Sequence, residues 1–286
     1  MADVDAANLI YHYLQKDLID SQPNQFNSIA CRLVLDLSVW IHPDDYARLP
    51  IVFPYIVRDP ELSTKVRKPW GNPQPSTGYF KDDNSMIKAI VKGNNRVMNS
   101  GLVSRYNGKT LGRGFVASHV WREVPAIDSL ANRDPRLFSF IPNLVWLPKE
   151  LSRLSDVEGS SVQLALQKLS REIYRKLDLP TNLARFSEES WSLLDEGFDT
   201  AEELPVNLPE ISELTFIRLP NKYVNLRISK IGALSNALIG HGNSSDFDMP
   251  KISSKYDPLI RTIDRSVALD LGNKLNDYFE ALREVD

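Results

Sequence analysis

The chain of 286 residues contains a single cysteine, Cys31, which lies in an apolar run. One cysteine excludes an internal disulfide and every zinc site built from several cysteines, so neither kind of cross-link can brace the fold. An apolar core must hold it instead, and a hydrophobic content of 42% is sufficient to build one. We therefore expect a globular protein with one large domain or two small ones.

Membrane and export signals are not evident in the sequence. No stretch reaches the roughly 18 uncharged apolar residues that a transmembrane helix needs, so we expect no membrane partner. The first five residues contain two acids and no base, which argues against a signal or transit peptide. The sequence therefore predicts a cytoplasmic protein.

Charge is unevenly distributed along the chain. The net charge is only −3, but residues 61–122 contain eleven Lys or Arg against three acids, a balance of +8. Residues 181–214 contain nine acids and one Arg, a balance of −8. A basic segment beside an acidic one is typical of a phosphate-binding face on an otherwise acidic surface. The alternative is a solvated surface whose charge is merely uneven.

Apolar periodicity predicts the main elements. Apolar residues recur three and four positions apart over 5–19, 24–41, 160–177 and 261–284, which predicts amphipathic helices. Strand-like runs lie near 115–121, 143–147 and 214–231. Between them, Pro148 stands at a helix-start position, so we expect a helix from Pro148 to about Ser155.

Residues 112–156 bring several chemically useful side chains into one unit. His119 ends the first strand, an irregular loop follows, and Asn143 opens the second strand ahead of the expected helix. An imidazole titrates near neutral pH and is suited to taking a proton from water. His119 alone could equally be a satisfied core histidine, and Asn143 alone a turn or strand-start residue.

The strand–loop–strand–helix order, with His119 and Asn143 at these two positions, resembles the ββα-metal fold of HNH (His-Me finger) endonucleases. The phrase Asn-Leu-Val-Trp-Leu-Pro is similar to the second strand of that family. The resemblance implies that His119 is the general base and that Asn143 orients it or holds the loop.

The resemblance also implies one Mg²⁺ or Mn²⁺ ion, held by a residue of the helix. The family position falls on Ser152, a weak ligand, so we expect Asp156, four residues further, to bind the metal. Ser118 stands where the family often has an acid before the histidine, so the candidate metal ligands are Asp156, Ser152 and Ser118.

The basic segment predicts contacts with the phosphates or base edges of double-stranded DNA. The expected DNA-binding residues are Asn84, Lys88, Lys109, Arg113, Arg122, Arg153 and Lys255.

Together these observations predict an α+β protein in which a ββα-metal (HNH-like) nuclease core is embedded in a mainly helical chain. The expected organisation is an N-terminal helical region (1–60), a basic nuclease core (61–180) and a C-terminal α+β region for DNA recognition or dimerisation (181–286). The expected function is a metal-dependent DNA endonuclease of a type II restriction or phage-defence system, acting as a homodimer. The alternatives are a DNA-binding or scaffold protein with a degenerate, inactive finger, and a helical adaptor.

Overall fold

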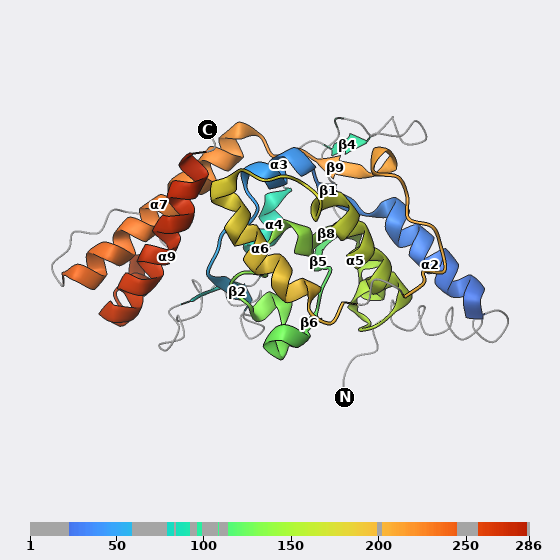
Figure 1. The fold of residues 1–286 in the computed structure, drawn as a ribbon, viewed down its shortest axis with the longest axis horizontal. Coiled ribbons are helices and arrows are strands. Elements are labelled where there is room, and N and C mark those ends of the chain that lie inside the picture. Colours follow the sequence, from blue (N-terminus) through green and yellow to red (C-terminus); the bar gives the residue numbers. More distant parts are fainter. Residues whose placement is uncertain are drawn as a thin grey trace.

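The computed structural model describes residues 23–58, 79–82, 84–91, 96–98, 108, 114–198, 202–244 and 257–284. The fold is α+β, with long helices at both ends of the molecule and a sheet between them (Figure 1). The α-helices are α2 (Pro23–Leu37), α3 (Pro43–Arg48), α4 (Ser85–Ile90), α5 (Ser161–Tyr174), α6 (Thr181–Asp195), α7 (Asn221–Asn243), α8 (Asp257–Ile260) and α9 (Arg265–Arg283). Short 3₁₀-helices are η2 (Pro125–Ile127), η3 (Ala131–Arg133), η4 (Ile141–Asn143), η5 (Ser152–Asp156) and η6 (Ile211–Glu213).

The main sheet has the strand order β4-β9-β1-β8-β5. Its strands are β4 (Arg96–Met98), β9 (Thr215–Ile217), β1 (Val39–Ile41), β8 (Leu144–Pro148) and β5 (Phe115–His119). The strands β1 and β9 run parallel, whereas the other neighbours are antiparallel. Because the strands come from all three of the expected segments, 1–60, 61–180 and 181–286, these segments share one sheet.

Two small ribbons flank the main sheet. The strands β2 (Ile56–Arg58) and β3 (Phe80–Asp82) pair in parallel, with Arg58 opposite Asp82. The strands β6 (Glu123–Val124) and β7 (Ser129–Leu130) form a short antiparallel hairpin within the loop that follows β5.

The apolar core contains side chains from both the helices and the main sheet. The apolar face predicted for 160–177 is buried along α5, and Tyr174 at its end donates a hydrogen bond to the carbonyl of Ile41 at 2.6 Å. Trp40 and Trp146 are fully buried on the neighbouring strands β1 and β8. The sheet is thus held to the helices by apolar contacts, as expected for a chain without cross-links.

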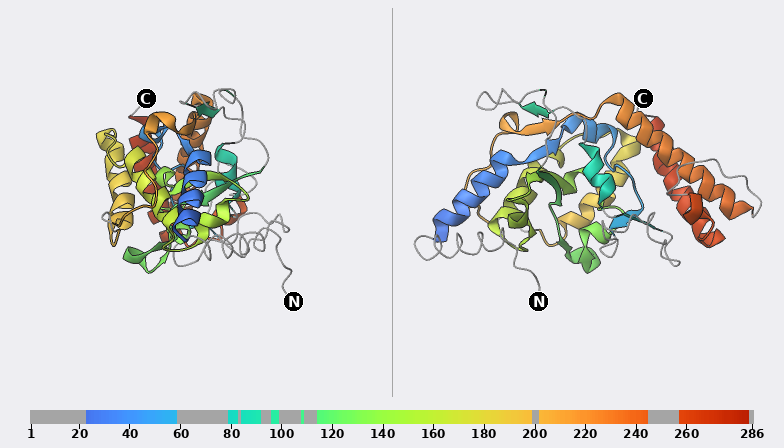
Figure 2. Two further views of the ribbon diagram at one scale, coloured as in Figure 1. Left: turned by 90° about the vertical axis from the view of Figure 1, so that its right-hand side faces the viewer. Right: turned by 180° about the vertical axis from the view of Figure 1, so that it is seen from behind.

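A hairpin formed by α7 and α9 extends from the body at the end opposite α2, in both the front and back views (Figures 1 and 2). The two helices approach closely because glycines face the partner helix. A Cβ atom on Gly272 would lie 2.9 Å from the backbone nitrogen of Ile239. At the root of the hairpin, Tyr278 exchanges hydrogen bonds with both the N–H and the carbonyl of Ile51.

Three expected elements are wrong in whole or in part, and the helix expected over 5–19 lies outside the described residues. The helix expected over 24–41 ends at Leu37, and Val39–Ile41 form the strand β1. Residues 148–155 do not form a helix starting at Pro148, because Pro148 ends β8 opposite Phe115 and only a short 3₁₀-helix follows. Of the strand-like run 214–231, only Thr215–Ile217 is a strand, and α7 begins directly after Pro220. Proline fixes the backbone φ angle that the N-cap position uses, so Pro220 starts a helix inside an apolar run that reads locally as strand.

Candidate functional site

His119 lies at the end of β5, opposite Leu144 in the register of β8. Its ring stacks on Phe138, with centroids 5.7 Å apart, and Nε2 lies 3.0 Å from the carbonyl oxygen of Phe138. Since a carbonyl oxygen can only accept, Nε2 carries the proton and the lone pair of the neutral ring lies on Nδ1. Burial of the ring lowers the pKa of His119 to about 4, and Arg58 acts in the same direction. His119 is therefore neutral at pH 7.

Asn143 is fully buried and closes the loop that follows His119. Its Oδ1 accepts a hydrogen bond from the backbone N–H of Trp121 at 2.9 Å, and its Nδ2 donates to the carbonyl of Leu137 at 3.1 Å. Through these two contacts Asn143 connects Trp121 and Leu137, which begin and end the loop between β5 and Phe138. The structure thus brings the two residues expected to be catalytic into one unit, in which Asn143 fixes the loop that anchors His119.

Three arginines, Arg58, Arg122 and Arg153, act electrostatically on Asp156, the residue at the end of η5, and we call them the arginine cluster. The surrounding protein removes solvent from its carboxyl and raises the pKa of Asp156, whereas the charges of Arg122, Arg58 and Arg153 lower it. The charge of Arg58 lowers the pKa of both His119 and Asp156, so Arg58 is within electrostatic range of both residues. Throughout the described ranges the guanidinium groups of Arg58 and Arg122 make no hydrogen bond or ion pair, which leaves them available to an anion.

The expected metal ligands do not assemble. Ser152 donates its hydroxyl to the carbonyl of Lys149 at 2.9 Å, and Ser118 is buried on the strand face opposite that of its neighbour His119. In a 3₁₀-helix with three residues per turn, Asp156 does not lie on the same side as Ser152, contrary to the expectation for an α-helix.

The described residues contain no group of three His, Cys, Asp or Glu side chains that could hold a metal ion. The carboxylate of Asp156 is instead influenced by the charges of three arginines. These residues do not supply the oxygen donors that Mg²⁺ or Mn²⁺ needs, so the metal stays a prediction.

Of the expected DNA-binding residues, Arg122 and Arg153 join the cluster. Asn84 is buried at the N-cap of α4, where its Oδ1 has no hydrogen-bond partner, so it does not present a polar edge to DNA. Lys88 is exposed on the same short helix, which packs against β5. Lys109, Arg113 and Lys255 lie outside the described residues.

Arg58 is the functional candidate that sequence reasoning missed. It belongs to a proline-rich stretch, 43–60, that reads as loop, and it is separated from His119 by 61 positions. The short apolar run Tyr55–Val57 before it could have indicated a strand end, but nothing in the local pattern relates it to β5.

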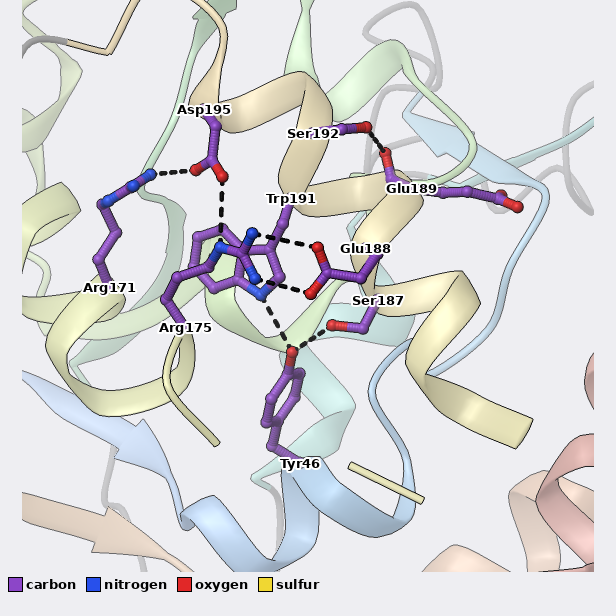
Figure 3. A network of polar contacts seen from close by, with 9 residues as sticks. All are labelled: Tyr46, Arg171, Arg175, Ser187, Glu188, Glu189, Trp191, Ser192 and Asp195. Carbon is purple, nitrogen blue, oxygen red and sulfur yellow. Dashed lines mark hydrogen bonds and ion pairs between the residues drawn. The ribbon is translucent and has the colours of Figure 1, made fainter. Parts of the chain in front are cut away.

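A polar network between α5 and α6 supports the loop from behind (Figure 3). The ring of Trp121 packs edge-on against Trp191, with centroids 5.8 Å apart, and Trp191 donates its indole N–H to the hydroxyl of Tyr46 at 3.1 Å. Arg175 binds Glu188 through two hydrogen bonds of 2.7 and 3.1 Å and lies over the Trp191 ring. Through Trp121, the backbone that follows His119 therefore packs against this network.

No family model, curated protein or solved structure matches the chain. None of the described helices is both long and apolar enough to cross a membrane.

Proposed function

We propose that this protein is a DNA endonuclease of the HNH type, in which His119 is the general base. The observation that carries the proposal is a neutral imidazole whose Nε2 is anchored to Phe138 and on which the charge of Arg58 acts, while Arg58 also acts on Asp156 together with Arg122. Phosphodiester hydrolysis needs a base for water and positive charge for the phosphate, and this arrangement offers both.

The proposed step starts with a water molecule at Nδ1 of His119. The water transfers a proton to Nδ1 while its oxygen attacks phosphorus, and the bond to the leaving sugar oxygen breaks, with a proton supplied from solvent. Arg58, Arg122 and Arg153 stabilise the negative charge on the non-bridging oxygens. Asn143 takes part only by holding the loop, since its amide is committed to Trp121 and Leu137.

A second function is favoured by the donor set around Asp156. Three arginines act on the carboxylate of Asp156, and the hydroxyl of Ser152 already donates to the carbonyl of Lys149. This set of side chains is better suited to binding a phosphate than to binding a metal ion. The chain would then be a DNA-binding or scaffold protein with a degenerate, catalytically inactive HNH-like finger.

Cleavage of supercoiled plasmid separates the two functions. The wild-type protein is incubated with Mg²⁺ or Mn²⁺ and, in parallel, with EDTA; loss of nicking in EDTA would show that cleavage needs a divalent metal ion, as the sequence resemblance implies. We expect His119→Ala to lower the nicking rate by about 10²–10⁴-fold. His241→Ala is the matched control, because His241 also contacts a backbone carbonyl through Nε2, that of Ile263 at 3.0 Å. A His119→Ala variant that cuts at the wild-type rate contradicts the proposal, and a wild type that binds DNA without cutting supports the second function.

DNA binding itself is tested by fluorescence anisotropy over a range of salt concentrations. Each phosphate contact contributes a log–log slope of about −0.9, so Arg58→Ala should flatten the slope by about that amount. Arg185→Ala, an exposed change on α6, is the control and should leave the slope unaltered. An unchanged slope for Arg58→Ala would remove Arg58 from the binding site.

The biological setting that we propose is a type II restriction or phage-defence system in the cytoplasm. A site with one general base cuts one strand, so cleavage of both strands calls for a homodimer. Cleavage of plasmid to the linear form at low enzyme excess tests the coupling of two sites.

A further inference from the structure

The helix α2 has apolar side chains on two faces. One face is buried in the core through Cys31, Val34 and Leu35. On the other face lie Ile29, Leu33 and Leu37, which are 42%, 45% and 44% exposed and are spaced four residues apart, so that they form one continuous stripe. We call Ile29, Leu33 and Leu37 the α2 stripe. Large apolar side chains exposed in a row, rather than singly, indicate a surface that a partner covers.

Two opposite charges border one edge of the α2 stripe. Arg32 and Asp36 are exposed and stand one helical turn apart. Neither forms a hydrogen bond or ion pair anywhere in the described part of the chain. In this order, with the cation N-terminal to the acid, a pair within one helix gains little stabilisation. Both charges therefore remain available to a partner.

The pattern is complementary to itself. When two copies of such a helix pack antiparallel about a two-fold axis, the same edges of the two helices meet. The apolar rows then contact each other, and Arg32 of each copy faces Asp36 of the other copy, which gives two symmetric ion pairs. In a parallel pair about a two-fold axis, the two charged edges would lie on opposite sides of the interface, so that Arg32 and Asp36 would not face each other.

The surroundings of α2 leave room for a second copy. The helix forms one end of the molecule, opposite the α7–α9 hairpin (Figures 1 and 2). Beside the charged edge lies a hollow of about 310 Å³, lined in part by Leu35, Val206 and Leu208. Arg32, Asp36 and Glu213 also line this hollow, so charged as well as apolar side chains border the α2 stripe on this side. A standard interface covers about 800 Å² per partner, and a helix about 22 Å long with this border provides less, so the dimer should be weak and concentration-dependent.

We propose that the α2 stripe is a self-association surface, through which two copies of this chain pair antiparallel about a two-fold axis. The proposal does not depend on nuclease activity. It is independent of the arginine cluster and names the surface by which a dimer forms.

Sedimentation velocity of the full chain, from micromolar to submillimolar concentration, tests the proposal. We expect a reversible monomer–dimer equilibrium for the wild type. Leu33→Glu places two carboxylates at the apolar centre and should raise the dissociation constant at least about 100-fold. Leu226→Glu is the control, because Leu226 is 52% exposed on α7 and lies outside the α2 stripe.

The charge-swap series tests the antiparallel register. Arg32→Glu should weaken the dimer by about tenfold, and adding Asp36→Arg to it should restore wild-type affinity, because the two ion pairs re-form with reversed sign. A wild type that is monomeric at all concentrations overturns the proposal. So does a monomer whose melting temperature falls on Leu33→Glu, since the stripe would then be covered by its own chain, including residues 1–22. Failure of the double variant to recover overturns the antiparallel pairing.

Discussion

Replacement of Asn143 by alanine should destabilise the whole protein as well as the loop. The Asn143 side chain is fully buried and forms two hydrogen bonds, one from the N–H of Trp121 and one to the carbonyl of Leu137. Alanine removes both partners at once and leaves a backbone donor and a backbone acceptor in a buried position.

The expected size follows from these two contacts. An unsatisfied buried polar group costs about 1–3 kcal/mol, so the two groups together should lower the free energy of unfolding by about 2–5 kcal/mol. For a protein whose total stability is about 5–15 kcal/mol, this is a large fraction. Water entering the space left by the amide would reduce the loss towards the lower limit.

Urea denaturation measures the effect through the midpoint and slope of the transition. Ser152→Ala is the matched control, because Ser152 makes one surface hydrogen bond to Lys149 and should change stability by less than about 0.5 kcal/mol. Hydrogen exchange adds a local measurement, since the amide of Trp121 loses its acceptor in Asn143→Ala. An Asn143→Ala variant as stable as Ser152→Ala, with Trp121 still protected, would refute the role of Asn143 in holding the loop.

Two further predictions concern acid stability and helix packing. The pKa of His119 is about 4 in the folded protein against 6.5 in the unfolded chain. The unfolded chain therefore binds more protons between these values. The contribution of His119 is complete above pH 6.5 and is lost as pH falls towards 4, up to roughly 3 kcal/mol. His119→Gln should flatten this part of the curve of unfolding free energy against pH, and an unchanged curve would contradict the assignment. In the α7–α9 hairpin, Gly272→Ala should lower the free energy of unfolding by about 1–3 kcal/mol, because the added methyl group would clash with the backbone of Ile239. A melting curve identical to that of the wild type would show that the two helices can separate without cost.

Local pattern was sufficient for several elements of this protein. The periodicity over 160–177 and 261–284 predicted α5 and α9, and the short β runs predicted β5 and β8. The helices α5 and α9 each bury one face whose apolar residues recur with the helical period, so the information lies within the element itself.

Other features were decided by contacts between distant segments. Pro148 at the end of β8 pairs with Phe115, and this pairing overrides the local signal for a helix start. The order of the main sheet unites residues from 39 to 217, which no local window contains.

The candidate site divides in the same way. His119 and Asn143 were identified from the sequence because their residue types and spacing resemble a known motif. Arg58 reaches the site through the β2–β3 ribbon. The neutral state of His119 depends on the burial of its ring, and its tautomer is fixed by the carbonyl of Phe138, a backbone atom without a sequence signature. The sequence by itself thus determined which side chains are available and which faces are apolar. Only the tertiary structure decided which charges act on the histidine and which donors are already bonded to backbone carbonyls. It also decided which apolar row of α2 stays outside the core. These features depend on contacts between segments that are far apart in the chain.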